Sequence, residues 1–426
     1  MKLTSYWLDT AEPAGDFRRA ELPEQVDVAV IGAGLTGLSA ALHLARRGAS
    51  VAVLESHTVG WGASGRNGGM ATTGLAISFP AAVKRYGAER ATAMFTAYDD
   101  AIDTVEKIVT DEEIACDFVR SGKLTLAAKP AHYAALERSA EMIERLIGRS
   151  VQLVPRGRMR DELGSDRYHG AQVDPNGAGA HVGKLVMGLA RAAVGHGALV
   201  AENAAVTGVR RVGPGNGHRV QTTRGVLTAS DVLIATSGYT GSLTPWLRRR
   251  IVPVGSFIVV TEPLPDDLVA QLMPHRRMAS DTKNLLYYFR PTPDNRLLFG
   301  GRARFALSDA QSDLKSGEIL RKAVTEVFPR LRDVRLDYCW GGLVDMTMDQ
   351  MVHAGVRDGM HYSVGYSGHG VQMATHMGKV MADVIGGDPT VNPWKGLAFP
   401  PVPGHFGPPW FLPAAGAFFR ALDAVR

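Results

Sequence analysis

The feature that most constrains the fold is a glycine pattern between two apolar runs near the N-terminus. Residues 26–55 read VDVAVIGAGLTGLSAALHLARRGASVAVLE, with Gly32, Gly34 and Gly37 at the spacing G-x-G-x-x-G. The first glycine permits a tight turn, the second lets the backbone approach a pyrophosphate, and the third lets a helix pack on the preceding strand. The pattern predicts a βαβ unit that binds a dinucleotide.

The residues after the glycines support this interpretation. Their apolar side chains recur at helical spacing, so the predicted helix directs its first N–H groups at phosphate oxygens. The second predicted strand, residues 51–54, ends at Glu55, where a carboxylate can accept a hydrogen bond from a ribose hydroxyl. We expect the following residues to bind the nucleotide: Gly32, Gly34, Leu35, Thr36, Gly37, Glu55 and Ser56.

Two further glycine-rich segments favour a large ligand. Residues 60–70 read GWGASGRNGGM, which suits backbone packed against a cofactor, with a flexible surface loop as the alternative. Residues 365–372 read GYSGHGVQ and precede an apolar stripe at helical spacing. A glycine-rich helix start is an anion or dipole site, although a structural capping turn would look the same.

With these segments, the chain resembles the FAD-dependent amine oxidoreductases, the family that contains D-amino acid and sarcosine oxidases. It is most similar to the γ-glutamylputrescine oxidases within that family, and the likeness extends to residues 281–302 and 340–351. The resemblance implies FAD as cofactor, with residues 60–70 along the pyrophosphate and under the isoalloxazine ring. It also implies that the GYSGHGVQ turn lies against the flavin.

On this resemblance we expect a second group of residues to contact FAD. They are Gly62, Ala63, Ser64, Arg66, Asn67, Gly68, Gly69, Met70, Val206, Ser237, Gly238, Gly342, Gly368, His369, Gly370 and Val371.

The cysteines bear on how FAD is held. Some sarcosine-oxidase relatives attach FAD through a cysteine just ahead of the segment that matches residues 347–349. Here that segment reads WGGLVDMTMD, without a cysteine, and Cys339 lies eight residues before Thr347. We therefore expect non-covalent FAD.

The chemistry expected of the family moves a hydride equivalent from an amine to the flavin and gives an imine that water hydrolyses. A strong base is not required, but a positive charge or dipole near the reduced ring helps. His369, Arg66 and the helix after Gly370 are the candidates, together with Tyr288 as a catalytic residue. A purely capping role for His369 is the alternative.

Substrate-binding residues are expected on the strand that contains Tyr287 and Tyr288, which point to opposite faces. Tyr288 and Arg290 share a face, and this pair suits a substrate with both an amine and a carboxylate. A core tyrosine and a surface arginine are the alternative. Arg302, Met346 and Met348 are further candidates, and His181 could cap a helix or line the entrance.

Length and composition indicate an enzyme of two domains, and with the βαβ unit and the resemblance we expect an α/β fold. The 426 residues exceed what one core usually supports, and the 47 basic against 42 acidic residues give no dense basic run for nucleic acid. We expect an FAD-binding Rossmann-like domain from residues 1–75, 150–240 and 335–390. A substrate domain with a large mixed or antiparallel sheet would come from residues 76–149 and 241–334, followed by a Pro- and aromatic-rich tail at 391–426.

The sequence thus predicts oxidation of an amine, such as a γ-glutamylated polyamine, with O2 as electron acceptor. A D-amino acid or N-methyl amino acid dehydrogenase that reduces a quinone or carrier is the main alternative, and an FAD-containing binding protein without activity is another. The two cysteines exclude a disulfide reductase. We expect no metal, no transmembrane segment and a cytoplasmic location, and the oligomeric state stays open.

Overall fold

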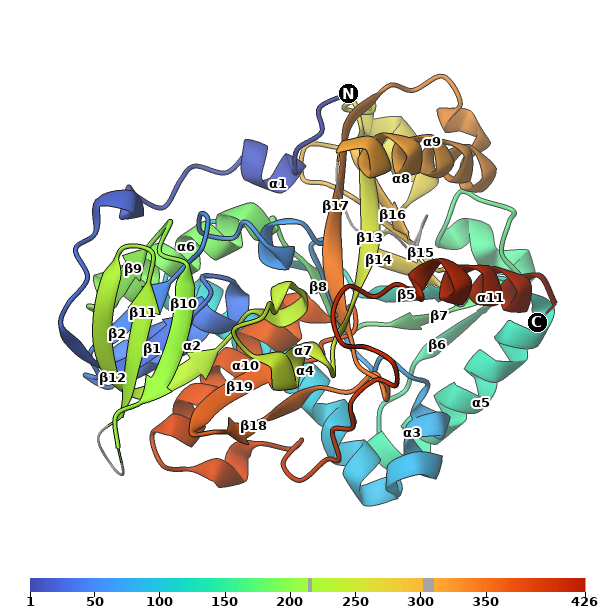
Figure 1. Ribbon diagram of the computed structural model, residues 1–426. Helices are drawn as coiled ribbons and strands as arrows, with labels where there is room; N and C mark the ends of the chain where they lie inside the picture. The colour runs from blue at the N-terminus through green and yellow to red at the C-terminus, as the bar shows by residue number, and fades with distance from the viewer. Residues whose placement is uncertain (214–216, 302–309, 426) are drawn as a thin grey trace.

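The computed structural model describes residues 1–213, 217–301 and 310–425, and two large sheets organise them. Figure 1 shows the first sheet on the left and the second on the right. Arg302 falls outside the described residues, so its predicted role in substrate binding has no structural counterpart here.

The first sheet has a parallel centre. Strand β1 runs parallel to β12 on one side and β2 on the other, so Val30 pairs with Leu233 and with Val53. Strands β9 and β19 extend the parallel part, whereas β10, β11 and β18 are antiparallel additions. The strands of this sheet are β1 (Gln25–Ile31), β2 (Val51–Leu54), β9 (Leu199–Ala201), β10 (Val206–Arg211), β11 (His218–Thr222), β12 (Gly225–Ile234), β18 (His353–Arg357) and β19 (Met360–Val364).

The second sheet is mixed, with strand order β17-β13-β16-β15-β14-β5-β7-β6. All of its pairs are antiparallel except β14 with β5. Its strands are β5 (Lys123–Leu126), β6 (Gln152–Pro155), β7 (Gly170–Asp174), β13 (Val252–Thr261), β14 (Met278–Asp281), β15 (Tyr287–Pro291), β16 (Leu297–Gly301) and β17 (Leu336–Met346). A small third sheet joins β3 (Met70–Thr72), β8 (Gly177–Gly179) and β4 (Val119–Arg120).

Helices cover both sheets. Helices α2, α4, α6 and α10 contribute most of the apolar core on one face of the first sheet, and α8 and α9 pack in a second core against the mixed sheet. The helices are α1 (Tyr6–Asp9), α2 (Leu35–Ala45), α3 (Phe79–Tyr86), α4 (Ala88–Asp111), α5 (Pro130–Ile147), α6 (Val182–Gly195), α7 (Pro245–Arg248), α8 (Asp266–Leu272), α9 (Ala310–Val327), α10 (Gly370–Ile385) and α11 (Leu412–Val425).

The expected fold class is confirmed, and the predicted second strand of the βαβ unit, residues 51–54, is β2. Strand β12 runs parallel beside β1. Helices α3 and α4 are separated at Gly87, which adopts φ +82°.

Sheet membership differs from the predicted domain boundaries. Strands β6 and β7 pair within the mixed sheet, although residues 150–174 were expected in the FAD-binding domain. Strand β17 likewise pairs with β13 along its length, from Val252–Met346 to Thr261–Leu336. The second and third of the segments predicted for the FAD-binding domain, 150–240 and 335–390, therefore contribute strands to the second sheet, and the division into two domains stays a proposal.

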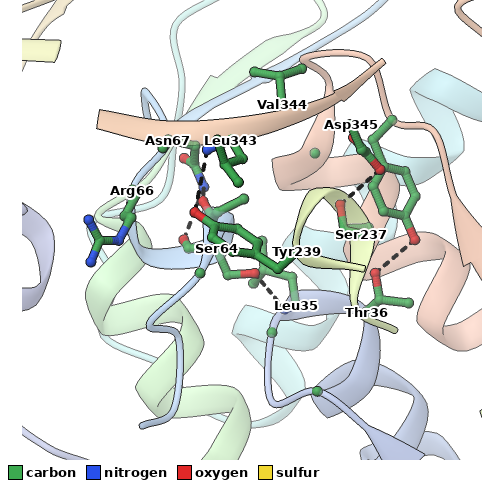
Figure 2. A pocket seen from close by; sticks show the side chains of 18 of the residues that line it. Leu35, Thr36, Ser64, Arg66, Asn67, Ser237, Tyr239, Leu343, Val344 and Asp345 are labelled. Atoms are coloured by element: carbon green, nitrogen blue, oxygen red, sulfur yellow. Dashed lines mark hydrogen bonds between the residues drawn. The ribbon is translucent and has the colours of Figure 1, made fainter. Parts of the chain in front are cut away.

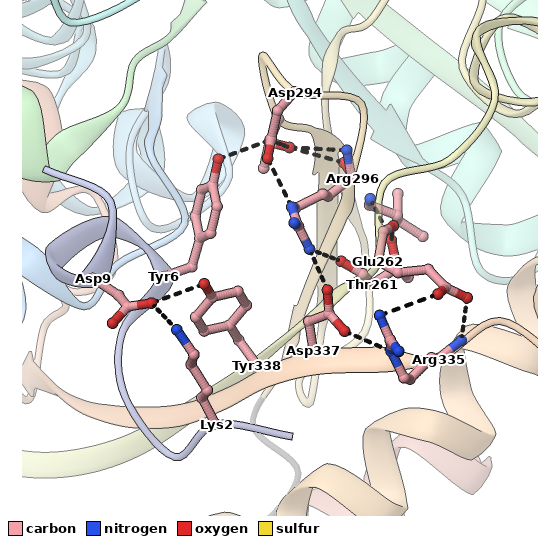
Figure 3. A network of polar contacts seen from close by, with 12 residues as sticks. Lys2, Tyr6, Asp9, Thr261, Glu262, Asp294, Arg296, Arg335, Asp337 and Tyr338 are labelled. Carbon is pink, nitrogen blue, oxygen red and sulfur yellow. Dashed lines mark hydrogen bonds and ion pairs between the residues drawn. The ribbon is translucent and has the colours of Figure 1, made fainter.

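A network of polar contacts holds the N-terminal segment against the mixed sheet (Figure 3). The hydroxyl of Tyr6 donates to Asp294 at 2.7 Å, and the hydroxyl of Tyr338 donates to Asp9 at 2.8 Å. Arg296 bridges Asp294 and Asp337 at 2.7 and 2.6 Å. These contacts fix α1 beside the strands that carry the predicted substrate residues.

Hydrogen bonds join the tail to the rest of the chain at several places. The amide of Val402 donates to the carbonyl of Arg249 at 2.8 Å, and Asp423 in α11 accepts from the amides of Asn284 and Leu285. Phe406 and Trp410 between these places are 72% and 75% exposed. The Pro- and aromatic-rich tail predicted at 391–426 is thus attached to the rest of the chain by backbone and side-chain hydrogen bonds.

Candidate functional site

A cavity of about 620 Å³ lies where the carboxyl ends of β1, β2 and β12 meet the mixed sheet. Its wall combines the first glycine turn, residues 60–70, the end of β12, the middle of β17 and the turn before α10. Open α/β sheets bind ligands at the carboxyl ends of their strands. The volume lies within the range of cofactor sites.

The first glycine turn has the predicted geometry. Gly32 adopts φ +110°, which favours glycine, and a Cβ at Gly37 would overlap the carbonyl oxygen of Gly32. Gly37 therefore lets α2 pack closely on β1 and does not line the cavity, whereas Gly32, Gly34, Leu35 and Thr36 do. Gly32 thus makes the turn and Gly37 the close helix packing, and the approach of a pyrophosphate to Gly34 stays a prediction.

Glu55 lies at the end of β2 with its carboxylate at the cavity wall. One carboxylate oxygen accepts from the amide of Ala33 at 2.8 Å, and the other accepts from the amide of His57 at 2.8 Å. The side chain is 12% exposed. Glu55 is thereby oriented at the place where the βαβ pattern predicts a ribose hydroxyl, and Ser56 lines the cavity beside it.

Residues 60–70 form an ordered wall. The hydroxyl oxygen of Ser64 accepts from the amide of Leu35 at 2.9 Å and so joins this segment to the start of α2. The amide group of Asn67 donates to the carbonyls of Ala63 and Ser64, and its oxygen accepts from the amide of Gly69. These contacts argue against a flexible surface loop.

Arg66 lines the cavity, but its guanidinium binds backbone. It donates to the carbonyls of Trp61 at 2.7 Å and Gly341 at 3.3 Å, and it lies 5.1 Å from the Trp61 ring. Figure 2 shows the group directed away from Ser237 and Asp345. A role of Arg66 as the cation at the reduced ring has therefore little support from its contacts.

The turn before α10 forms the opposite wall. Gly368 adopts φ +98°, and a Cβ on Gly368 or Gly370 would meet no atom within 4 Å. His369 occupies the N-cap position of α10, but its side chain accepts no capping hydrogen bond and its ring packs edge-on against Tyr98 at 5.4 Å. The His369 side chain therefore makes no capping hydrogen bond to α10, and its role beside the flavin stays a prediction.

Asp345, Tyr366 and Tyr239 are among the polar residues of the wall that sequence reasoning missed. Asp345 is buried, and its carboxylate accepts from the Ser237 hydroxyl at 2.8 Å and from the amide of Gly365 at 2.7 Å (Figure 2). Burial raises its pKa. The hydroxyls of Tyr366 and Thr36 lie 2.8 Å apart, which links the turn before α10 to α2. Tyr239 also lines the cavity.

The other predicted cofactor residues fall into two groups, those that line the cavity and those that do not. Those that line the cavity are Gly62, Ala63, Ser64, Asn67, Gly68, Met70, Val206, Ser237, Gly342, Gly368, His369, Gly370 and Val371. Gly69 and Gly238 do not line it, because Gly69 packs against Trp7 and Ala180, and Gly238 packs against Leu343. Both support the wall from behind.

The two adjacent tyrosines point as the strand pattern predicts. Tyr288 lines the cavity, and its hydroxyl lies 3.0 Å from that of Ser256. Tyr287 faces the other side of the sheet, where its ring packs against Phe299 and lies 3.3 Å from the ammonium of Lys283. Of this adjacent pair, Tyr288 is therefore the one that faces the cavity.

Arg290 does not reach the cavity, although it shares a face with Tyr288. Its guanidinium donates to the carbonyls of Gly69 and Ala180, and the residue is 3% exposed. Burial lowers its pKa to about 10. Met348 is 56% exposed and lies outside the wall. The prediction that Tyr288 and Arg290 bind the substrate together is therefore wrong for Arg290, which lies outside the cavity that Tyr288 lines.

His181 caps a helix instead of lining the entrance. Its Nδ1 accepts from the amide of Lys184 at 3.2 Å at the start of α6, and its Nε2 lies 2.9 Å from the Thr10 hydroxyl. Burial lowers its pKa to about 4.

The mixed sheet contributes polar residues that the sequence did not single out, among them Ser256, Ser280 and Lys123. Lys123 begins β5, and the alternation in KLTL was the available signal, because Leu124 and Leu126 are buried on the opposite face.

The wall fits FAD. The start of α2 and Glu55 suit a pyrophosphate and a ribose, and the positive end of α10 lies at the other side of the same cavity. The open space in front of Gly368 and Gly370 leaves room for a ring system. Among the described residues, no cluster of His, Cys, Asp or Glu is arranged to hold a metal ion, and no helix is long and apolar enough to cross a membrane.

Comparison with known proteins gives the same assignment. The family model for FAD dependent oxidoreductases matches residues 27–384. A probable oxidoreductase, OrdL, of Haemophilus influenzae is 34% identical over 407 residues, which cover 94% of this chain and 92% of the relative. The gamma-glutamylputrescine oxidoreductase of Escherichia coli is 34% identical over 387 residues, covering 90% and 89%.

A solved structure has the same fold. The glycine oxidase of Geobacillus kaustophilus superposes with a TM-score of 0.73 at 23% identity, over 87% of this chain and 98% of that one. From the matched residues, the two relatives and the geometry of the cavity, the chain belongs to the family of FAD-dependent oxidoreductases.

Proposed function

We propose that this FAD-dependent oxidoreductase oxidises the C–N bond of an amine that carries a carboxylate, such as a γ-glutamylated polyamine, with O2 as the electron acceptor. The observation that carries the proposal is the cavity, which joins the FAD-type glycine turn to the polar face of the mixed sheet. The likeness to a gamma-glutamylputrescine oxidoreductase supports the substrate class.

Bound FAD supplies the hydride acceptor that this oxidation needs. The protein's part is to position the amine and to set the local charge. The positive end of α10 faces the cavity behind Gly370 and stabilises negative charge that develops there. Tyr288, fixed through its hydroxyl contact with Ser256, is placed to orient the substrate.

Anaerobic mixing of the holoprotein with a panel of amines tests the proposal. The panel contains γ-glutamyl amines, polyamines, N-methyl amino acids and D-amino acids, and flavin absorbance reports reduction whatever the natural acceptor is. We expect γ-glutamyl amines to reduce the flavin fastest. Reduction by D-amino acids alone would contradict the substrate class, and slow reoxidation of the reduced protein by O2 would favour a quinone or carrier as acceptor.

A matched pair of variants tests the role of the mixed sheet. Tyr288→Phe removes the cavity-facing hydroxyl, whereas Tyr287→Phe removes a hydroxyl on the opposite face of the same strand. We expect slower flavin reduction only in Tyr288→Phe. Equal rates in the two variants would remove Tyr288 from the site.

We also propose a cytoplasmic location, which the two free, buried cysteines suit. Localisation of a tagged chain by cell fractionation tests it, and recovery in a membrane or exported fraction would contradict it.

A further inference from the structure

The cavity contains one basic side chain whose position the family likeness does not explain. Lys123 and Arg66 are the lysine and arginine residues of the described chain that line the cavity. Arg66 is engaged by the carbonyls of Trp61 and Gly341. Lys123 lies at the other side, on the mixed sheet, and its role is open.

The sheet register places Lys123 beside the residues expected to meet substrate. Strand β5 pairs with β14, and β14 pairs with β15, so Thr125 is opposite Ser280 and Ser280 is opposite Tyr288. Lys123 shares the face of Thr125, because the two lie two residues apart on one strand. Lys123, Ser280 and Tyr288 therefore form one polar face toward the cavity.

The ammonium of Lys123 has a neutral partner. It donates to the carbonyl oxygen of Thr73 at 2.9 Å, and in the described ranges of the chain no carboxylate lies within 4 Å of it. An ammonium has three donors, so this single contact leaves capacity for a further acceptor. Lys123 is half-buried, and a partly desolvated cation without a close counter-ion is stabilised when a ligand supplies the negative charge.

The carboxylates nearest to Lys123, those of Asp99 and Asp174, form ion pairs with Arg149. Arg149 lies 3.0 Å from Asp99 and 3.6 Å from Asp174, and Asp99 also accepts from the Thr73 hydroxyl. Asp99, Arg149 and Asp174 do not line the cavity, whereas Lys123 does. Burial lowers the pKa of Lys123, with Asp174 and Asp99 opposing the shift and Arg149 adding to it.

The backbone that holds Lys123 is also tied to the flavin-side helix. Gln372 in α10 donates to the carbonyl of Thr72 at 2.6 Å, and Lys123 donates to the carbonyl of the next residue, Thr73. These two contacts fix the position of the ammonium relative to α10. A fixed ammonium can hold a substrate carboxylate at a set distance from the amine that reacts.

Building on the proposed function, we propose that Lys123 binds the carboxylate of the substrate and so selects carboxylated amines over plain polyamines. A cation at this position would repel a substrate ammonium, so it favours the anionic end of the molecule. Lys123 takes the part that the sequence had given to Arg290, whose guanidinium is enclosed by Gly69 and Ala180.

Glutarate, a dicarboxylate without an amine, is the probe for this subsite. Its Kd for the oxidised holoprotein is measured from the perturbation of the flavin spectrum in wild type, Lys123→Met, Lys123→Arg and Lys283→Met. Lys283 is the matched control, because it is a partly buried lysine of the same sheet region that pairs with Asp281 and does not line the cavity. We expect the Kd for glutarate to rise roughly 10- to 100-fold in Lys123→Met and to stay near the wild-type value in Lys123→Arg and Lys283→Met.

The pH dependence separates binding from a structural effect. Glutarate binds the protonated lysine, so wild-type affinity falls as pH rises through the lowered pKa of Lys123, whereas Lys123→Arg keeps its affinity over that range. An unchanged Kd in yellow Lys123→Met, or no saturable glutarate binding to wild type, overturns the proposal. If no amine reduces the wild-type flavin, the proposed function fails while the glutarate comparison still decides the role of Lys123.

Discussion

The carboxylate of Glu55 accepts a hydrogen bond from the backbone amide of Ala33 at 2.8 Å, so the end of β2 holds the glycine turn that follows β1. Glu55→Ala removes this contact and the expected contact with a ribose hydroxyl. We expect FAD binding to weaken by about 1.5–3 kcal/mol, a roughly 10- to 150-fold rise in Kd. The Kd for FAD is measured by titrating the apoprotein with FAD and following the flavin fluorescence. An unchanged Kd would mean that Glu55 does not bind the ribose.

FAD is expected to leave the protein on denaturation. Neither Cys116 nor Cys339 lines the cavity, and the Cys339 thiol lies 3.1 Å from the carbonyl of Asp313 in the core. Acid precipitation should therefore leave a colourless pellet and a yellow supernatant. Flavin that remains with the pellet would contradict non-covalent binding.

His369→Ala is expected to slow flavin reduction while the protein stays folded and yellow. Loss of a positioned electrostatic contact costs on the order of 10²-fold in rate, and loss of the ring contact with Tyr98 costs about 0.5–1.5 kcal/mol of stability. His376→Ala is the control, since His376 lies on the same helix but outside the cavity wall. A normal reduction rate with a lower Tm would assign His369 a structural role.

Arg290→Met is expected to lower stability more than substrate affinity. The substitution leaves the carbonyl of Ala180 without a donor, at about 1–3 kcal/mol, whereas the carbonyl of Gly69 keeps the amide of Ala180 as its donor. Thermal unfolding and substrate titration of the flavin spectrum measure the two effects. A large loss of substrate affinity with a normal Tm would instead restore Arg290 to the substrate site.

Stability is expected to fall on acidification through His181. Its folded pKa of about 4 lies below the usual 6.5, so between these values the unfolded chain binds more protons and the folded state loses stability as pH falls. The loss approaches about 3 kcal/mol at the acid end. His181→Asn keeps a capping acceptor without this titration, so urea unfolding at pH 7 and pH 4.5 should show a smaller difference. An equal difference in both proteins would exclude His181 as a cause.

Local motifs made the nucleotide side predictable, because the turn at Gly32, the packing at Gly37 and the end of β2 at Glu55 all lie within one βαβ unit. The substrate side depends on pairing between distant strands. Lys123 reaches the cavity only because β5 lies beside β14, and no sequence spacing encodes that neighbour.

Arg290 shows a different limit of sequence reasoning. Strand alternation correctly gave the face that it shares with Tyr288, but the extent of the cavity along the strand is set by the carbonyls of Gly69 and Ala180. Those carbonyls come from the segments before β3 and before α6, which are remote in the chain.

The pairing of β1 with β12, and the contact of Thr36 in α2 with Tyr366 in the turn before α10, have a consequence for biosynthesis. The glycine turn between β1 and α2 is translated early, whereas β12 and α10 are translated much later. A nascent chain can therefore display the nucleotide motif long before it has a complete pocket. Cofactor loading becomes a late event, and the yellow colour of the protein reports that almost the whole chain has been made and folded.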